Sequence, residues 1–145
     1  MTESTTRLCH ILVADDEPHI GRIIKMKLEQ GPFRVSLAYD GQEALDFVNS
    51  GEQLDLVLLD LMMPVMDGFT FLNMIRADPR YERLRVVVVT AKELTPEETE
   101  QLRQQTPHVL QKADAFGEEL KRLLRTLLQA APPRPAAVPM PGNDL

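Results

Sequence analysis

Residues 54–68 read LDLVLLDLMMPVMDG, and this stretch decides the fold. The run LDLVLL at 54–59 is almost wholly apolar, as expected for a strand that is covered by helices on both faces of a parallel sheet. It breaks at one aspartate, Asp60, before a Met-Met-Pro turn. A charged side chain directly after a buried strand indicates a functional edge of the sheet, and the rest of the sequence supports that interpretation.

Five short apolar runs recur along the chain, separated by longer segments with helical periodicity. The third and fourth runs are nearly continuous, which suits central strands, whereas the second and fifth alternate more and suit the edges. Strand and helix alternate five times, which predicts an α/β fold, a doubly wound parallel sheet with helices on both faces. The runs are LCHILVA at 8–14, FRVSLA at 33–38, LDLVLL at 54–59, RVVVVT at 85–90 and HVLQ at 108–111.

The segments between and after these runs carry apolar faces with helical spacing. One segment, TPEETEQLRQQ at 95–105, has little besides Leu102 to bury, so we expect it to be exposed and comparatively mobile. Its Thr-Pro start with two glutamates is typical of a helix N-terminus. The other faces are marked by Ile20, Ile23, Ile24 and Leu28; by Ala44, Leu45 and Val48; by Phe69, Leu72 and Ile75; and by Phe116, Leu120, Leu123, Leu124, Leu127 and Leu128.

The 145 residues, 43% apolar, fit one globular domain, which we place at 8–129 after a short tail at 1–7. Residues 130–145 are rich in proline, and we expect a disordered tail. The net charge of −6 disfavours binding to nucleic acid. With no apolar leader and no run long enough to cross a membrane, the chain is expected to be cytoplasmic.

Polar residues stand at the ends of the predicted strands. Because the carboxyl ends of parallel strands meet at one edge, we expect these residues to converge there. Each also has a structural interpretation, since aspartates cap helices and start turns, threonine ends β-branched strands, and lysine is common on surfaces. The residues are Asp15 and Asp16, Asp60, Thr90 and Lys112.

Three carboxylates at one site repel each other unless a cation neutralises them. Mg²⁺ prefers oxygen ligands and leaves room for a phosphate oxygen in its coordination shell. A carboxylate can act as a nucleophile and form an aspartyl phosphate, whose charge then requires a metal ion, a hydroxyl group and a cation around it. Asp60, Mg²⁺, Thr90 and Lys112 would supply those roles.

At these residues the sequence resembles the receiver domain of two-component response regulators. The motifs are VADDE at 13–17, LLDLMMPVMDG at 58–68, VVVT with Ala91, and Lys112. The resemblance covers about residues 8–129 and implies a flavodoxin-like (CheY-like) three-layer fold with strand order 2-1-3-4-5.

The resemblance also implies a role for each matching residue. Asp60 would accept a phosphoryl group from a sensor histidine kinase or a phosphotransfer protein, with Thr90 as the switch hydroxyl and Lys112 as the paired cation. Asp16 would bind Mg²⁺ directly and Asp15 through water, while Pro64 and Gly68 would shape the loop. The full implied metal-binding set is Asp15, Asp16, Asp60 and the main-chain carbonyl of Met62.

The sequence departs from the family pattern at three places. Ala113 follows Lys112 where a proline is usual, which predicts a trans bond and a displaced lysine. Val109 stands where many receivers have an aromatic switch residue, so that switch cannot operate. Met62 and Lys92 flank the expected path of hydrolytic water and cannot orient it, so we predict slow loss of the phosphoryl group; alternatively, both are tolerated surface residues.

Three functions compete. The first is a phosphorylation-dependent switch that catalyses only its own modification and binds an unknown downstream protein, as a monomer or as a homodimer through the fourth and fifth helices. The second is a phosphatase of the haloacid-dehalogenase type, which is disfavoured because Met62 stands where that class needs an aspartate. The third is a scaffold that does not depend on phosphorylation, disfavoured because the acid pair and Asp60 remain.

Overall fold

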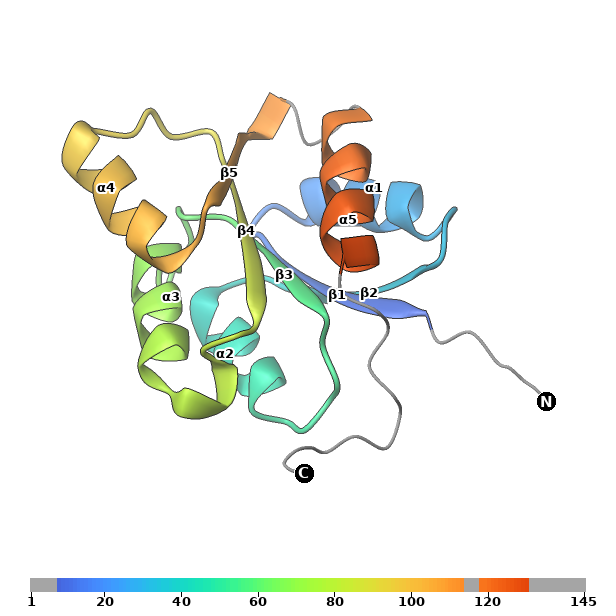
Figure 1. Cartoon of the computed structure of the whole chain (residues 1–145), viewed down its shortest axis with the longest axis horizontal. Helices are drawn as coiled ribbons and strands as arrows, with labels where there is room; N and C mark the ends of the chain where they lie inside the picture. Colours follow the sequence, from blue (N-terminus) through green and yellow to red (C-terminus); the bar gives the residue numbers. More distant parts are fainter. Residues whose placement is uncertain (1–7, 114–117, 131–145) are drawn as a thin grey trace.

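The computed structural model describes residues 8–113 and 118–130. Figure 1 shows a central sheet with helices on both sides. The strands are β1 (Cys9–Ala14), β2 (Phe33–Ala38), β3 (Leu56–Leu59), β4 (Arg85–Thr90) and β5 (His108–Gln111). The helices are α1 (Pro18–Leu28), α2 (Gly41–Val48), α3 (Gly68–Ala77), α4 (Pro96–Gln105) and α5 (Glu118–Ala130), with a short 3-10 helix, η2 (Pro79–Tyr81).

The sheet has the predicted topology. All four strand pairs are parallel, and the order is β2-β1-β3-β4-β5. The bounds of β2, β4 and β5 agree with the apolar runs, whereas β3 begins two residues later than its run, at Leu56. The predicted α/β, flavodoxin-like fold is therefore confirmed, with β2 and β5 at the edges.

Helices cover the two faces of the sheet in two groups. One hydrophobic cluster joins α1 and α5 to the sheet through residues such as Ile24 and Leu124. The other joins α2, α3 and α4 to the opposite face through residues such as Ala44 and Leu102. All four residues of β3 are buried and alternate between the two clusters, which explains why its sequence is continuously apolar.

The predicted helical faces need two corrections. Ile23 is 36% exposed, because α1 turns Gly21, Ile24 and Leu28 toward the sheet instead. Phe71 was not predicted to be buried, yet it is the largest fully buried side chain of α3. Spacing alone sets a helical face only to within about one residue, so a neighbouring position can replace the expected one.

The weakly apolar helix behaves as its sequence indicates in two respects. Leu102 is the buried residue of α4, and Thr95 and Glu98 form a reciprocal capping box at its start. The mobility that we expect of α4 stays a prediction. Phe116 and both predicted tails lie outside the described residues, except for Ala130, which is the last residue of α5.

No described helix is long and apolar enough to cross a membrane.

Candidate functional site

The carboxylates meet at the carboxyl edge of the sheet because their strands are neighbours. Asp15 follows β1 and Asp60 follows β3, and the amide of Asp60 donates to the Ala14 carbonyl at 2.9 Å. Asp16 extends the first of these strand ends. One carboxylate oxygen from each of Asp15, Asp16 and Asp60 lies within 4.8 Å of the others. The predicted convergence of the three acids is therefore present.

Lys112 reaches into the middle of this cluster from the end of β5. Its Nζ lies 3.1 Å from Asp15 Oδ2, 3.2 Å from Asp60 Oδ2 and 3.4 Å from Glu17 Oε1. None of the peptide bonds in the described ranges is cis, so the bond before Ala113 is trans. From this trans backbone the Lys112 side chain reaches Asp15 and Asp60, while its displacement relative to other receivers stays a prediction.

Glu17 is a site residue to which sequence reasoning gave no role. It lies within the VADDE motif, but its partner is 95 positions away along the chain. Its amide also donates to Asp15 Oδ1 at 2.9 Å, which fixes the turn that leads into α1. The motif already contains Glu17, whereas the ion pair depends on β1 and β5 ending at the same edge of the sheet, with β3 and β4 between them.

The electrostatics of the site are unbalanced. Asp15 and Asp60 are each only 4% exposed. Burial raises the pKa of the Asp15 carboxyl, and the charge of Asp60 adds to that rise, against the hydrogen bond from Glu17 and the cation of Lys112. Although burial acts in the opposite direction, Asp15 and Asp60 raise the pKa of Lys112 to about 12. One lysine thus faces more carboxylates than it can neutralise.

Thr90 and Met62 complete the edge in different ways. Thr90 is fully buried at the end of β4, and its Oγ1 accepts a hydrogen bond from the amide of Lys92 at 2.9 Å. Met62 donates its amide to Asp60 Oδ1 at 3.2 Å, while its side chain projects into solvent with 58% exposure. The main chain of Met62 is therefore the part that contacts the site.

The loop after Asp60 is built by close backbone contacts. A Cβ on Gly68 would lie 2.3 Å from the Asp60 carbonyl oxygen, so only glycine fits there. Asp67 caps α3 by accepting from the amide of Thr70 at 2.8 Å. Within the described residues, the only non-glycine position with positive φ is Val65, at 68°, which is an unfavourable conformation for a β-branched residue.

This donor set fits a hard divalent cation. Magnesium takes oxygen ligands, and the oxygens of Asp15, Asp16 and Asp60 are gathered where negative charge is in excess. The backbone of Met62 lies beside them through its bond to Asp60. The cluster is compatible with the Mg²⁺ site that the sequence predicts.

Comparison with known proteins gives the same assignment. The chain matches the response regulator receiver domain over residues 11–124. It is 39% identical over 82 residues to the response regulator GtcR of Aneurinibacillus migulanus, covering 57% of this chain and 32% of that protein. It is 34% identical over 130 residues to MprA of Mycobacterium tuberculosis, covering 90% and 55%. The chain thus spans between a third and about half of the length of these relatives.

The chain is also similar to solved structures of receiver domains and response regulators. A receiver domain of a Francisella response regulator superposes with a TM-score of 0.72 at 31% identity, covering 82% of this chain and 95% of the other. TrrA of Thermotoga maritima, in complex with Mg²⁺ and BeF, superposes with a TM-score of 0.72 at 30% identity, covering 83% and 100%. The fold, the cluster of acids and these matches lead to one conclusion: this chain belongs to the receiver domain family of two-component response regulators.

Proposed function

We propose that Asp60 accepts a phosphoryl group from the phosphohistidine of a sensor kinase or phosphotransfer protein. The observation that carries this proposal is the position of the Asp60 carboxylate. It is held by the Met62 amide on one oxygen and by Lys112 on the other, in a buried cluster of acids. A fixed, poorly solvated carboxylate beside a cation can attack phosphorus in line, with the imidazole as the leaving group.

Asp15, Asp16, Asp60 and the main-chain carbonyl of Met62 would hold Mg²⁺ in this reaction. When bound, the ion offsets the charge of the carboxylates and of the phosphoryl oxygens. Lys112 stands ready to pair with a phosphoryl oxygen on Asp60, since its Nζ already contacts Oδ2 of that residue. Lys112 is charged at neutral pH, as lysines ordinarily are, and Asp15 and Asp60 raise its pKa further, to about 12, against the effect of burial.

Thr90 would report the modification to the surface. Its hydroxyl oxygen accepts from the Lys92 amide, and the Lys92 ammonium lies 3.4 Å from Glu98 in the capping box of α4. A hydroxyl that turns toward a phosphoryl oxygen gives up its bond to the Lys92 amide. The change would thereby reach the start of α4 without an aromatic residue at Val109. The surface of α4, β5 and α5 would then bind an unknown downstream protein or a second copy of the chain.

The lifetime of the phosphoryl group is a separate proposal. Met62 and Lys92 flank Asp60 and Thr90, and neither carries a carboxylate or amide side chain that orients water for hydrolysis. The Lys92 side chain is also engaged with Glu98. We therefore predict a lifetime on the order of minutes or longer. Met62→Asn should shorten it; an already short lifetime that the substitution leaves unchanged would contradict the prediction.

The test of the proposed function is a mass measurement. The full chain is incubated with acetyl phosphate, with and without Mg²⁺, and its intact mass is recorded. We expect one added phosphoryl group that requires both Mg²⁺ and Asp60, so Asp60→Asn should gain none. Asp46→Asn, which changes an exposed aspartate of α2, is the matched control and should behave as wild type. A chain that gains no phosphoryl group and is not stabilised by Mg²⁺ would instead be a scaffold.

A further inference from the structure

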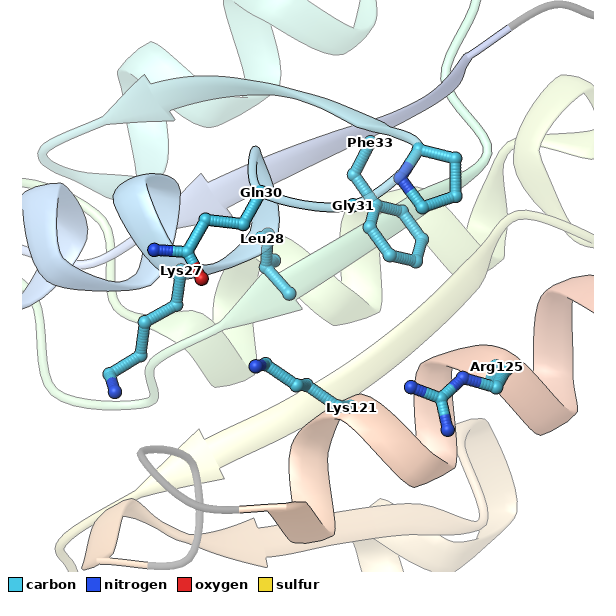
Figure 2. A pocket seen from close by; sticks show the side chains of 8 residues that line it. Lys27, Leu28, Gln30, Gly31, Phe33, Lys121 and Arg125 are labelled. Carbon is cyan, nitrogen blue, oxygen red and sulfur yellow. The ribbon is translucent and has the colours of Figure 1, made fainter.

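A cavity lies at the opposite end of the molecule from the acid cluster. It has a volume of about 380 Å³ and is enclosed by the end of α1, the loop into β2 and the exposed side of α5. Figure 2 shows Lys121 and Arg125 extending from α5, with Leu28, Gly31 and Phe33 across the cavity from them. The lining residues are Lys27, Leu28, Gln30, Gly31, Pro32, Phe33, Lys121 and Arg125.

The wall of this cavity is already formed by backbone hydrogen bonds. The Gly31 amide donates to the Leu28 carbonyl, and the Phe33 amide donates to the Gly31 carbonyl, both at 2.9 Å. Lys25 and Glu29 tie the same turn to β2 through Val35. A ligand would therefore find the loop in place and would not have to order it on binding.

The charge of the cavity is opposite to that of the protein. Its three ionisable lining residues, Lys27, Lys121 and Arg125, are all cations, and no carboxylate lines it, although the chain carries a net charge of −6. The ion pairs of the described residues include none of these three cations. Lys25, two residues before Lys27, is by contrast bound to Glu29 at 2.9 Å.

The floor of the cavity is apolar. Leu28 is buried, and half-buried Phe33 packs against the same hydrophobic cluster as α1 and α5. The cavity thus offers an apolar surface beneath three cationic groups from two different helices. An anion without an apolar part would leave the ring of Phe33 in contact with water, and an apolar molecule without charge would leave the cations unpaired.

We propose that this cavity is a second binding site, for a small phosphate monoester that carries an apolar or aromatic group. The phosphate would lie at Lys121 and Arg125, with Lys27 adding positive charge from α1, and the apolar group would lie on the ring of Phe33. A phosphate monoester is doubly charged at neutral pH and matches several cations better than a carboxylate does. Arginine also presents a planar fork of donors to phosphate oxygens. The cavity is near the lower limit for ligand sites, so the ligand is small.

The test is an NMR titration of the ¹⁵N-labelled full chain with phenyl phosphate in buffer without Mg²⁺. We expect saturable shifts of the Gly31, Phe33 and Lys121 amides, with those around Asp60 unchanged. Inorganic phosphate should bind about fivefold more weakly or worse, since it lacks the apolar part. Phenol should cause no saturable shift. Equal affinity for phenyl phosphate and inorganic phosphate would overturn the proposal, as would shifts confined to the acid cluster.

Two variants test whether the cations of α5 bind the phosphate group. Lys121→Gln and Arg125→Gln should each weaken phenyl phosphate binding about tenfold, because each removes a charged hydrogen-bond donor. Arg122→Gln is the matched control, since Arg122 is exposed on the same helix and does not line the cavity. Arg125 is exposed as well, so its replacement does not put folding at risk. Unchanged binding in both of the first two variants would overturn the proposal.

Phosphatidic acid also carries a phosphate monoester next to apolar chains, but at a membrane surface. A binding experiment with vesicles distinguishes this lipid from a soluble phosphate monoester. Retention of the chain by vesicles that contain phosphatidic acid, lost in Arg125→Gln, would assign the phosphate to a lipid headgroup. Saturable binding of phenyl phosphate without such retention assigns it to a soluble molecule. Both results support the shared chemistry, and the absence of both would overturn it.

Discussion

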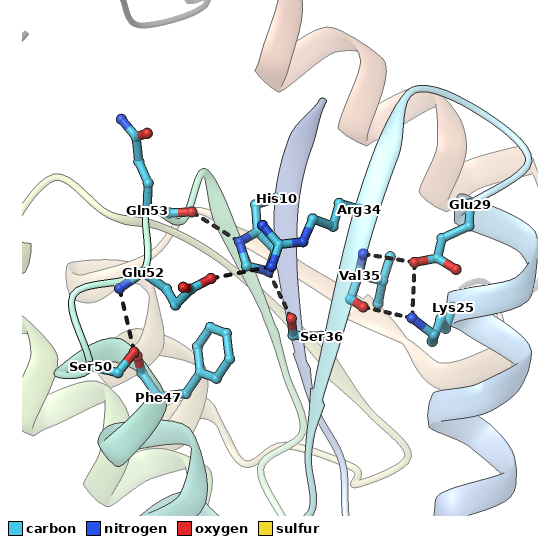
Figure 3. A network of polar contacts seen from close by, with 10 residues as sticks. All are labelled: His10, Lys25, Glu29, Arg34, Val35, Ser36, Phe47, Ser50, Glu52 and Gln53. Carbon is cyan, nitrogen blue, oxygen red and sulfur yellow. Dashed lines mark hydrogen bonds and ion pairs between the residues drawn. The ribbon is translucent and has the colours of Figure 1, made fainter. Parts of the chain in front are cut away.

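The two ends of strand β1 hold polar clusters of opposite character. At its carboxyl end, Asp15 joins acids that outnumber the one cation between them. At its amino end, His10 is 2% exposed, and its ring nitrogens lie 3.0 Å from the Gln53 carbonyl and 2.8 Å from Ser36 Oγ. Figure 3 shows these contacts beside the ring of Phe47.

The cluster at the amino end of β1 stabilises the fold, whereas the cluster at its carboxyl end is arranged for reactivity. The polar groups of the His10 cluster are hydrogen-bonded to one another: besides the two ring contacts, the main-chain amide of His10 donates to the Asp55 carboxylate at 2.8 Å. Such a cluster fixes the register of neighbouring strands. The acid cluster is left with unbalanced charge, which weakens the fold until a cation or a new charge distribution arrives. Removal of the polar side chain should therefore lower stability at His10 and raise it at Asp60.

The largest effect is expected at Gly68, beneath the acid cluster. Its added Cβ in Gly68→Ala would lie 2.3 Å from the Asp60 carbonyl oxygen and 2.7 Å from Leu61 Cα, and backbone atoms cannot move away cheaply. We expect the free energy of unfolding to fall by about 3 kcal/mol in urea titrations. The control is Gly21→Ala, where the nearest atom is a flexible leucine end at 3.4 Å. A similar loss in both variants would contradict the explanation.

The second largest loss of stability is expected when the hydrogen bonds of the His10 ring are removed. His10→Leu leaves the Gln53 carbonyl without its ring partner and Ser36 without its own, so the free energy of unfolding should fall by about 2 kcal/mol. Phosphorylation by acetyl phosphate should be retained, because the acid cluster is at the other end of the strand. Arg34→Gln removes a neighbouring exposed ion pair, with Glu52, and should cost about 0.5 kcal/mol or less. Equal losses in the two variants would show that the buried bonds contribute nothing.

Asp60→Asn should raise the free energy of unfolding, in contrast to the two preceding substitutions. It removes a buried charge that faces Asp15, while Lys112 keeps its contact with Asp15 at 3.1 Å. Without Mg²⁺, thermal and urea unfolding should show a gain on the order of 1 kcal/mol. Added Mg²⁺ should stabilise the wild type more than the variant, which narrows that gain. The exposed Asp46→Asn is the control, and a destabilised Asp60→Asn chain would disprove the charge argument.

The smallest expected effect is the contribution of His10 to the pH dependence of stability. Burial lowers the pKa of His10 below its usual 6.5, so the folded chain binds its proton less readily than the unfolded chain. This contribution to stability is present above pH 6.5 and is lost as pH falls through the lowered pKa of the folded state. Urea midpoints of the wild type should therefore fall more between pH 7.5 and 5.5 than those of His10→Leu. Parallel slopes would rule out His10 as the source.

Much of the molecule follows from the sequence. The runs at 33–38, 85–90 and 108–111 are strands with the predicted bounds, because the apolar pattern of a strand is local and a short window reveals it. The run at 85–90, which is buried almost throughout, is also the most continuously apolar of the three. The acids and Lys112 could be placed at one edge, since parallel strands end together. Neither inference needed long-range information beyond the alternation of strands and helices.

Only the tertiary structure decided how these groups meet. The carboxyl ends of β1 and β5 lie at the same edge of the sheet, with β3 and β4 between them, and the Lys112 side chain reaches Glu17 along that edge. The rotation of α1 exposes Ile23 while Gly21 is buried. The basic cavity combines α1 with α5, which are about ninety positions apart in the chain. Sequence pattern determines the buried face of a helix only to within about one residue, because it depends on local spacing. Contacts between distant elements depend on side-chain reach and packing, which no local pattern contains.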